Sequence, residues 1–92
     1  MAQPQVGHQT TTVGTSVVLL FEAPTTYGQI HLYLNNEGGS KCYIGDASVS
    51  VTGADEGYNM DNGDILSMVL NGGEQIYAIS ASSSKMCLLW TL

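Results

Sequence analysis

Arginine is absent from this chain, and lysine occurs only twice, at Lys41 and Lys85. Eight carboxylate residues outnumber these two cations and give a formal net charge of −6 at pH 7. Nucleic-acid binding depends on Lys and Arg side chains that neutralise phosphates, and anionic membranes repel an acidic protein. The composition therefore predicts that neither nucleic acid nor a membrane surface is a partner.

Long apolar segments and helical periodicity are also missing. No segment approaches the roughly 20 consecutive apolar residues that span a bilayer. Residues 1–12 lack the basic and apolar regions of a signal peptide. We therefore expect synthesis in the cytoplasm, where Cys42 and Cys87 are reduced thiols. Charged residues make up only 11% of the chain and hydrophobic residues 43%, a composition that argues against disorder.

Short apolar runs bounded by turn residues fill most of the sequence. Ile30, Leu32 and Leu34 alternate with polar residues, which is the pattern of a half-buried strand. The same reasoning predicts strands at 9–13, 16–21, 29–35, 41–45, 48–52, 65–70, 75–80 and 85–92. Turn signals at intervals of roughly 8–12 residues are typical of a β-sandwich or small barrel.

These elements predict an all-β fold in a single domain at residues 10–92, after a flexible N-terminal arm at residues 1–9. The architecture is a small antiparallel β-sandwich or a jelly-roll-like barrel of roughly six to eight short strands. Residues 35–40 carry a strong turn signal, Asn-Asn-Glu-Gly-Gly-Ser. We expect this turn to join the flanking strands as a β-hairpin, with Tyr33 and Tyr43 on neighbouring strands.

Apolar residues lie on both faces of the predicted strands at 65–70 and 85–92. Leu66 and Met68 share one face of the strand at 65–70, and Ile65 and Val69 share the other. An antiparallel strand with one face in water alternates apolar and polar residues. Either these strands are central and covered on both faces, or another subunit covers one face, and in a chain this short we favour the subunit. The candidate subunit or capsid interface residues are His31, Tyr33, Tyr43, Leu66, Met68, Met86, Leu89 and Trp90.

Residues suited to catalysis are sparse. His8 and His31 are the two histidines, and neither belongs to a known nucleophile or zinc motif. One carboxylate cluster is present, comprising Asp55, Glu56, Asp61 and Asp64. Its spacing does not match a calcium-binding loop, so we expect solvated turn residues. The sequence predicts no enzyme activity, no cofactor and no metal.

Several strand and turn segments resemble small virion proteins of tailed bacteriophages. The family pattern has a VYIGG strand, a GYPL turn and a LYAIAAS strand, where this chain has CYIGD at 42–46, GYNM at 57–60 and IYAISAS at 76–82. Segments 17–21, 29–36 and 62–66 are similar too, so the resemblance covers roughly residues 10–92. Asp46 and Asn59 depart from the pattern, in turns where the family often has Gly and Pro.

The resemblance implies a structural virion protein, most specifically a capsid decoration (cement) protein that binds and stabilises the assembled phage head. It implies a location on the capsid exterior after assembly in the host cytoplasm. The expected partners are the major capsid protein and further copies of the chain, with a homotrimer favoured. Two alternatives stay open: a head–tail, neck or fibre-associated β domain, and a glycan-binding surface module that uses Tyr33 and Tyr43.

Overall fold

The structure is a computed structural model that describes residues 6–26 and 28–91. It contains eight β-strands and one short 3₁₀ turn, η1 (Gly53–Asp55). The strands are β1 (Val6–Val13), β2 (Val18–Glu22), β3 (Gln29–Asn36), β4 (Cys42–Gly45), β5 (Tyr58–Met60), β6 (Ile65–Asn71), β7 (Gln75–Ser80) and β8 (Ser84–Thr91). Within the described part of the chain, no helix has the length and apolar character needed to cross a membrane.

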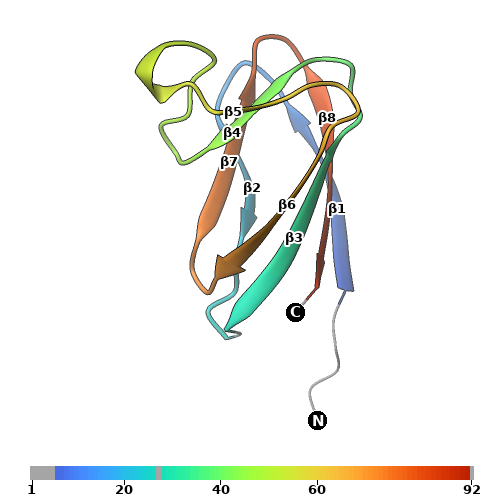
Figure 1. Cartoon of the computed structure of the whole chain (residues 1–92), viewed down its shortest axis with the longest axis vertical. Helices are drawn as coiled ribbons and strands as arrows, with labels where there is room; N and C mark the ends of the chain where they lie inside the picture. The colour runs from blue at the N-terminus through green and yellow to red at the C-terminus, as the bar shows by residue number, and fades with distance from the viewer. Residues whose placement is uncertain (1–5, 27, 92) are drawn as a thin grey trace.

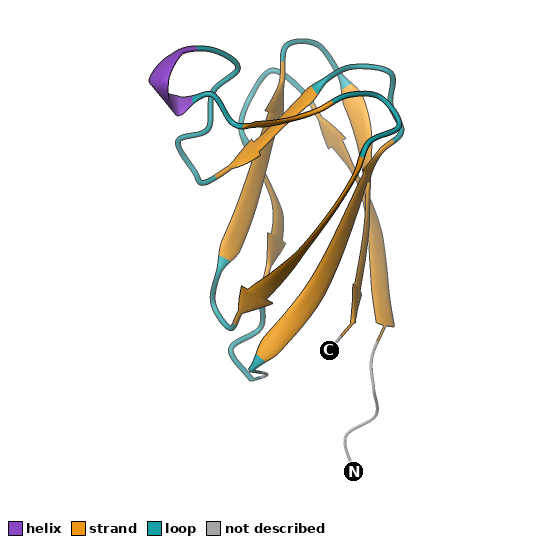
Figure 2. Ribbon diagram, in the orientation of Figure 1, coloured by secondary structure: helices purple, strands orange, loops and turns teal. Residues whose placement is uncertain are grey.

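The strands form two four-stranded sheets that pack face to face (Figure 1). Sheet A has the strand order β1-β8-β3-β6, and sheet B has the order β2-β7-β4-β5. Neighbouring strands are antiparallel throughout. Figure 2 shows that the ribbon consists of strands joined by loops, with η1 at one corner between β4 and β5. The predicted antiparallel β-sandwich is confirmed, with eight strands.

The core lies between the sheets and takes alternate residues from each strand. In β3, Ile30, Leu32 and Leu34 are fully buried, whereas His31 and Tyr33 between them are exposed. This arrangement follows directly from the period-two geometry of a strand. Burial of several large apolar side chains, at about 25 cal/mol per Å² of apolar surface, is the main force that holds the sheets together.

An aromatic pair, Phe21 and Trp90, closes the end of the sandwich at which β1 begins and β8 ends. A bulge between Leu19 and Phe21 shifts the register of β2, so that the consecutive residues Leu20 and Phe21 are both buried. The Phe21 and Trp90 ring centroids lie 4.8 Å apart. The Trp90 ring also packs directly over Gly7, where a Cβ atom would overlap it. Glycine at this position therefore makes room for the tryptophan.

A buried polar side chain, Asn36, ties the two sheets together at the other end. Its Nδ2 donates hydrogen bonds to the carbonyl oxygens of Ser40 at 2.7 Å and Met60 at 2.8 Å. Its Oδ1 accepts a hydrogen bond from the Ser84 hydroxyl at 2.5 Å. Asn36 belongs to β3 and Ser84 to β8 in sheet A, whereas Met60 belongs to β5 in sheet B. The side chain thus fixes one sheet relative to the other.

The predicted hairpin between β3 and β4 is wrong, because the two strands belong to different sheets. Both sides of β3 are occupied, by β6 and by β8, and this leaves no position for β4 beside it. Strand β4 pairs with β5 and β7 instead. Tyr33 and Tyr43 therefore lie on the outer faces of opposite sheets rather than on neighbouring strands.

The predicted N-terminal arm is also too long. Its first five residues lie outside the described part of the chain, but residues 6–9 form the first half of β1. Val6 pairs with Thr91 and Gln9 pairs with Leu88. The eight-residue strand β8 offers a complete ladder to β1, and its backbone groups hold these polar residues in a strand despite their weak hydrophobic pattern.

The predicted strand at 48–52 is wrong as well. The segment contributes one isolated bridge, from Ser50 to Glu56, and the chain then turns through η1. Strand β5 forms at Tyr58–Met60 instead and pairs with β4. Met60 is buried in the core. Val49 of the predicted segment is buried too, but it has no strand ladder, because β5 occupies the position beside β4.

Candidate functional site

Five of the seven exposed large apolar side chains on the described strands lie on the outer face of sheet A, and the other two, Leu19 and Tyr58, belong to sheet B. Register places Tyr33 between Leu89 of β8 and Ser67 of β6, and places His31 beside Val69. The outward apolar side chains and their exposed fractions are Tyr33 41%, Leu89 44%, Val69 49%, Val6 68% and Ile65 73%. We call these five residues the sheet A apolar face. Tyr33, Leu89 and Val69 form its contiguous centre.

Charge is distributed unevenly between the sheets. None of the eight carboxylates of the chain lies on a strand of sheet A; they lie on β2 and in the loops. Lys85 is the single Lys or Arg residue on these four strands. Desolvating a carboxylate is expensive unless it is paired, so a surface without carboxylates is suited to burial against another protein. An apolar, nearly uncharged face in a chain of net charge −6 is a marker of an interaction surface.

The predicted interface residues divide into three groups: those on the outer faces of the sheets, those at the margin of the core, and Met86 within the core. His31, Tyr33 and Leu89 lie on the outer face of sheet A, and Tyr43 lies half-buried on the outer face of sheet B. Three more pack at the margin of the core, where they are half-buried: Leu66, Met68 and Trp90.

Placing Met86 at the interface was wrong. Its side chain is fully buried between the sheets, because β8 points Met86 and Leu88 inward and Cys87 and Leu89 outward. The sequence prediction missed Val6, Ile65 and Val69 as exposed residues. A signal for the last two was available, because they occupy the opposite phase of the strand that carries Leu66 and Met68.

A shallow hollow of about 170 Å³ lies on this outer face, lined by His31, Tyr33, Ser67, Met68 and Val69. It opens between β3 and β6. Among the described residues, every buried side-chain nitrogen and oxygen has a hydrogen-bond partner. His31, Tyr33 and Ser67 bring polar groups to the hollow, and Met68 and Val69 bring apolar ones, so it is a shallow contact surface of mixed character.

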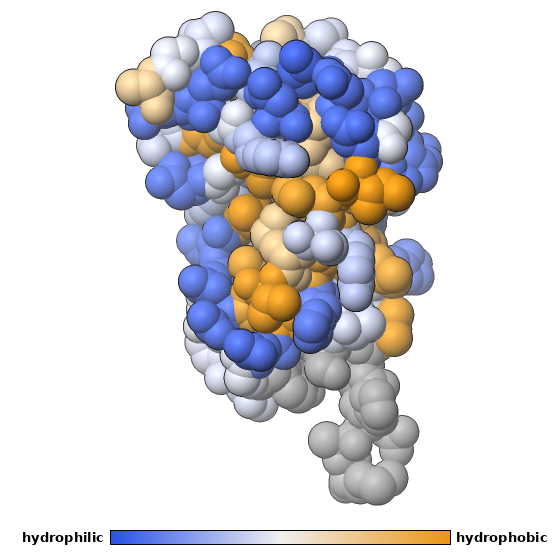
Figure 3. All heavy atoms as spheres, in the orientation of Figure 1, coloured by the Kyte–Doolittle hydropathy of each residue, from blue (hydrophilic) through white to orange (hydrophobic). Residues whose placement is uncertain are grey.

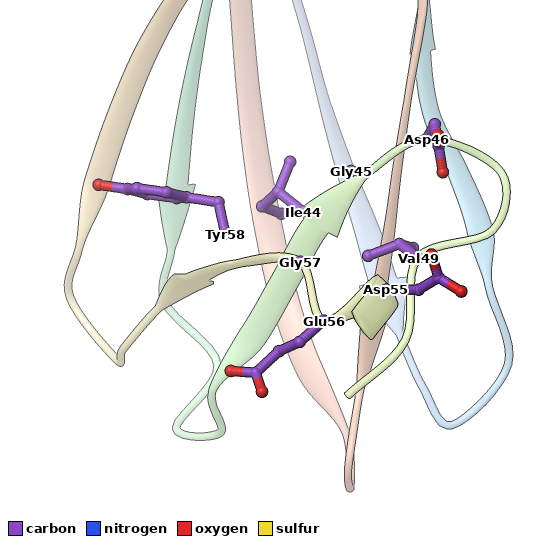
Figure 4. A pocket seen from close by; sticks show the side chains of 8 residues that line it. All are labelled: Ile44, Gly45, Asp46, Val49, Asp55, Glu56, Gly57 and Tyr58. Atoms are coloured by element: carbon purple, nitrogen blue, oxygen red, sulfur yellow. The ribbon is translucent and has the colours of Figure 1, made fainter. Parts of the chain in front are cut away.

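A second, larger hollow of about 240 Å³ lies beside η1 (Figure 4) and is lined by Ile44, Gly45, Asp46, Val49, Asp55, Glu56, Gly57 and Tyr58. The Glu56 side chain points away from those of Asp46 and Asp55. The Asp46 carboxylate accepts hydrogen bonds from the Ser48 hydroxyl at 2.7 Å and the Ser48 backbone N–H at 2.9 Å. These hydrogen bonds lower the pKa of Asp46 and show that this carboxylate stabilises a turn.

The carboxylates singled out in the sequence lie in two separate turns. Asp55 and Glu56 belong to the η1 loop, whereas Asp61 and Asp64 belong to the turn between β5 and β6. The Asp64 carboxylate accepts the Asp61 backbone N–H at 2.8 Å, and Asp61 lies 3.6 Å from the Lys41 ammonium group. Across the described ranges, no group of three or more His, Cys, Asp and Glu residues is placed to hold a metal ion.

The two cysteines are free thiols in different environments. Cys42 is buried on the inner face of sheet B, and Cys87 is half-buried on the outer face of sheet A. The Cys87 sulfur lies 3.9 Å from the Thr10 hydroxyl oxygen of β1. Burial raises the pKa of the Cys42 thiol, an effect that a hydrogen bond with Ser84 partly offsets. Cys42 therefore stays a protonated, inert core thiol over the range where an exposed thiol begins to ionise.

We expect a maleimide reagent at neutral pH to modify Cys87 quickly and Cys42 only after unfolding, since the thiolate must be reachable to react. Intact-mass spectrometry resolves one addition in the native chain and two in urea. Because the pKa of Cys42 is raised in the folded state, its contribution to stability is fully present below the ordinary thiol pKa and is lost as pH rises from there through the raised folded pKa. Rapid double labelling of the native chain would contradict the burial of Cys42.

Comparison with known proteins supports the fold. No family model matches the chain, and no curated protein matches it. Among solved structures, the chain is similar to one described as "Bacillus endospore appendages form a novel family of disulfide-linked pili". The TM-score is 0.58 at 11% sequence identity, over 97% of this chain and 85% of that chain.

The two chains share a fold. At this identity the likeness concerns the β-sandwich alone. The functional argument therefore rests on the exposed faces and edges of this chain.

Proposed function

We propose that the chain is a structural subunit that acts by binding other protein surfaces through sheet A. One observation carries the proposal: the exposed, carboxylate-free sheet A apolar face on a chain of net charge −6. An interface of this kind gains free energy from burial of apolar area, with aromatic anchors such as Tyr33 contributing most. The carboxylates elsewhere keep the unassembled subunit soluble.

The specific role that we propose is decoration of a tailed-phage head. The resemblance of segments such as 42–46 and 76–82 to small virion proteins supports this role. The net charge of −6 disfavours a component that lines the path of the DNA. The partners are the major capsid protein and other copies of the chain, with a trimer favoured. A protein that binds only the assembled head stabilises that state by mass action. The stabilisation is about 2.7 kcal/mol per site when the free protein concentration is 100 times its Kd.

The second candidate is a β domain of a fibre or other appendage. The similar solved structure, whose description names Bacillus endospore appendages that form disulfide-linked pili, is the reason for considering it. The glycan-binding alternative has less support, because Tyr33 and Tyr43 lie on opposite faces of the sandwich and make no common aromatic platform. Both candidates that we retain are assembly roles rather than catalytic ones.

The proposal is tested by placing carboxylates on the sheet A apolar face. We expect the double variant Tyr33→Glu, Leu89→Glu to weaken assembly roughly 1000-fold, because loss of two anchors at about 2 kcal/mol each removes about 4 kcal/mol of binding free energy. Light scattering after size-exclusion chromatography measures self-association, and co-sedimentation with isolated phage heads measures capsid binding.

The matched control is Ala54→Glu, which adds a carboxylate in the exposed η1 turn and is expected to leave assembly unchanged. Circular dichroism confirms that each variant is folded. A wild-type chain that is a monomer at high concentration and binds neither heads nor appendage proteins would refute the proposed function.

A further inference from the structure

Sheet A has open edges on both sides. Among the described residues, β1 and β6 each have a strand neighbour on one side only. β1 has eight residues and β6 has seven, and both lack Pro, Asp, Glu, Lys and Arg. Each pairs with its one neighbour in an uninterrupted register. A long, regular, uncharged edge of this kind is a template for pairing with another chain.

The edges of sheet B have features that block such pairing. Strand β2 is five residues long, contains a bulge between Leu19 and Phe21, and ends at Glu22. Strand β5 has only three residues. Short length, a bulge and a charge are the devices that protect exposed edges from other strands. The contrast within one molecule marks the edges of sheet A as the ones available for assembly.

The free backbone groups of β6 can be assigned from its ladder. The Asn36 N–H donates to the Asp64 carbonyl at 3.0 Å, which makes this a hydrogen-bonded pair at the start of the β3–β6 ladder. Hydrogen-bonded and non-hydrogen-bonded pairs alternate along an antiparallel ladder. The N–H and C=O groups of Ile65, Ser67 and Val69 therefore point away from β3, toward the open side.

The same alternation assigns the free edge of β1. The Glu37 N–H donates to the Lys85 carbonyl at 3.0 Å, so alternate residues of β8 from Lys85 onward bond to β3. The residues between them bond to β1, and this leaves the backbone groups of His8, Thr10 and Thr12 pointing outward. Each edge therefore offers alternate residues with free donors and acceptors at the same spacing.

We propose that copies of this chain join head to tail, with β6 of one copy pairing antiparallel to β1 of the next and extending sheet A across subunits. The inference rests on the proposed function, because it specifies how the subunits associate. One register pairs all seven residues of β6 and keeps the outer face continuous. It places Ser67 opposite Thr10, with Val69 opposite His8 and Ile65 opposite Thr12. In this register the free groups of both edges meet.

The apolar surface beside β6 supports this occupant. In Figure 3, hydrophobic side chains gather over the middle of the face that β6 crosses, with hydrophilic side chains above and below. Leu66 and Met68 are half-buried there, at the margin of the core. The next subunit's β1 would cover them without bringing a carboxylate to the seam, which matters when each subunit carries a net charge of −6. A head-to-tail contact of this kind closes into a ring, such as a trimer, or grows into a filament.

Cysteine cross-linking tests the pairing directly. In a Cys87→Ser background, Thr10→Cys and Ser67→Cys are made in separate chains, mixed, and treated with a short bifunctional maleimide. We expect roughly tenfold more cross-linked dimer from the mixture than from either chain alone, because a head-to-tail interface joins unlike surfaces. A chain that carries both substitutions is expected to give closed or extended oligomers on a denaturing gel.

The controls separate this geometry from its alternatives. Self-cross-linking of Thr10→Cys chains, or cross-linking of Ser67→Cys with Val69→Cys chains above the level of the first mixture, indicates two-fold pairing of like edges and overturns the proposal. The variant Ser67→Lys is expected to abolish the oligomer, whereas Asn59→Lys, on the short strand β5, is expected to preserve it.

The outcome also separates the two proposals. Oligomers without the Thr10–Ser67 cross-link overturn the strand pairing and leave the structural role standing. A chain that is monomeric in solution but still binds heads likewise overturns the strand pairing and leaves the structural role standing. A monomer that binds nothing overturns both.

Discussion

Replacing Asn36 with alanine is expected to lower the free energy of unfolding by about 4 kcal/mol, since each buried group left without its hydrogen-bond partner costs about 1–3 kcal/mol. The change deprives the Ser40 and Met60 carbonyl oxygens and the Ser84 hydroxyl of their partner at once. These groups come from both sheets, so the loss acts on the contact between them. In a domain of this size, 4 kcal/mol corresponds to a fall in Tm of about 20 °C.

Thermal and urea unfolding followed by circular dichroism measure this loss. Ser84→Ala removes one of the partners and is expected to cost about 1 kcal/mol. Asn35→Ala is the matched control, because the neighbouring asparagine bonds only to exposed Glu37 and its loss is expected to leave Tm nearly unchanged. Equal effects of Asn35→Ala and Asn36→Ala would contradict the role assigned to Asn36.

Gly38→Ala is the second change expected to have a large effect, at about 3 kcal/mol of destabilisation. A Cβ atom at this position would overlap the backbone nitrogen of Lys85 and the hydroxyl of Ser84. Backbone cannot move aside as the end of a side chain can, so overpacking here displaces β8 from the turn that follows β3. The Gly38 N–H also faces the Asn36 Oδ1 atom, at 3.4 Å, and the displacement therefore reaches the Asn36 network.

Gly14→Ala is the matched control for this prediction. A Cβ atom at Gly14 meets no other atom within 4 Å, and we expect its effect to stay within about 0.5 kcal/mol. Urea denaturation of the two variants under the same conditions gives the comparison. Similar midpoints for Gly38→Ala and wild type would mean that the turn relaxes freely, contrary to its close packing against β8.

Local sequence pattern predicted the strands well and their partners poorly. The alternation of Ile30, Leu32 and Leu34 reports which side of β3 is buried, because that information repeats every two residues. Nothing in the alternation says which strand lies alongside. The turn at 35–40 resembles a hairpin turn, yet burial of Asn36 and the two neighbours of β3 send the chain to the other sheet. Pairing depends on distant segments, which a local pattern does not contain.

The candidate interface was predictable in part for the same reason. Apolar residues on both faces of β6 and β8 indicated that some apolar side chains are exposed, and Leu89 was correctly placed among them. The pattern did not show which phase faces the core, so Met86 was placed on the wrong side. Nor did it reveal that the strands of sheet A exclude every carboxylate, because that fact emerges only when the strands are grouped into sheets.

The place of β8 within sheet A has a consequence for synthesis of the protein. This last strand lies between β1 and β3 and pairs with both, so sheet A has no centre until residues 84–91 leave the ribosome. Contacts between sequence-distant segments dominate the fold, and chains of that kind fold over milliseconds to seconds. Until that moment β1 has no strand partner in sheet A, and β3 has only β6. Completion of sheet A therefore waits for its last strand, whereas all four strands of sheet B exist once residue 80 has been made.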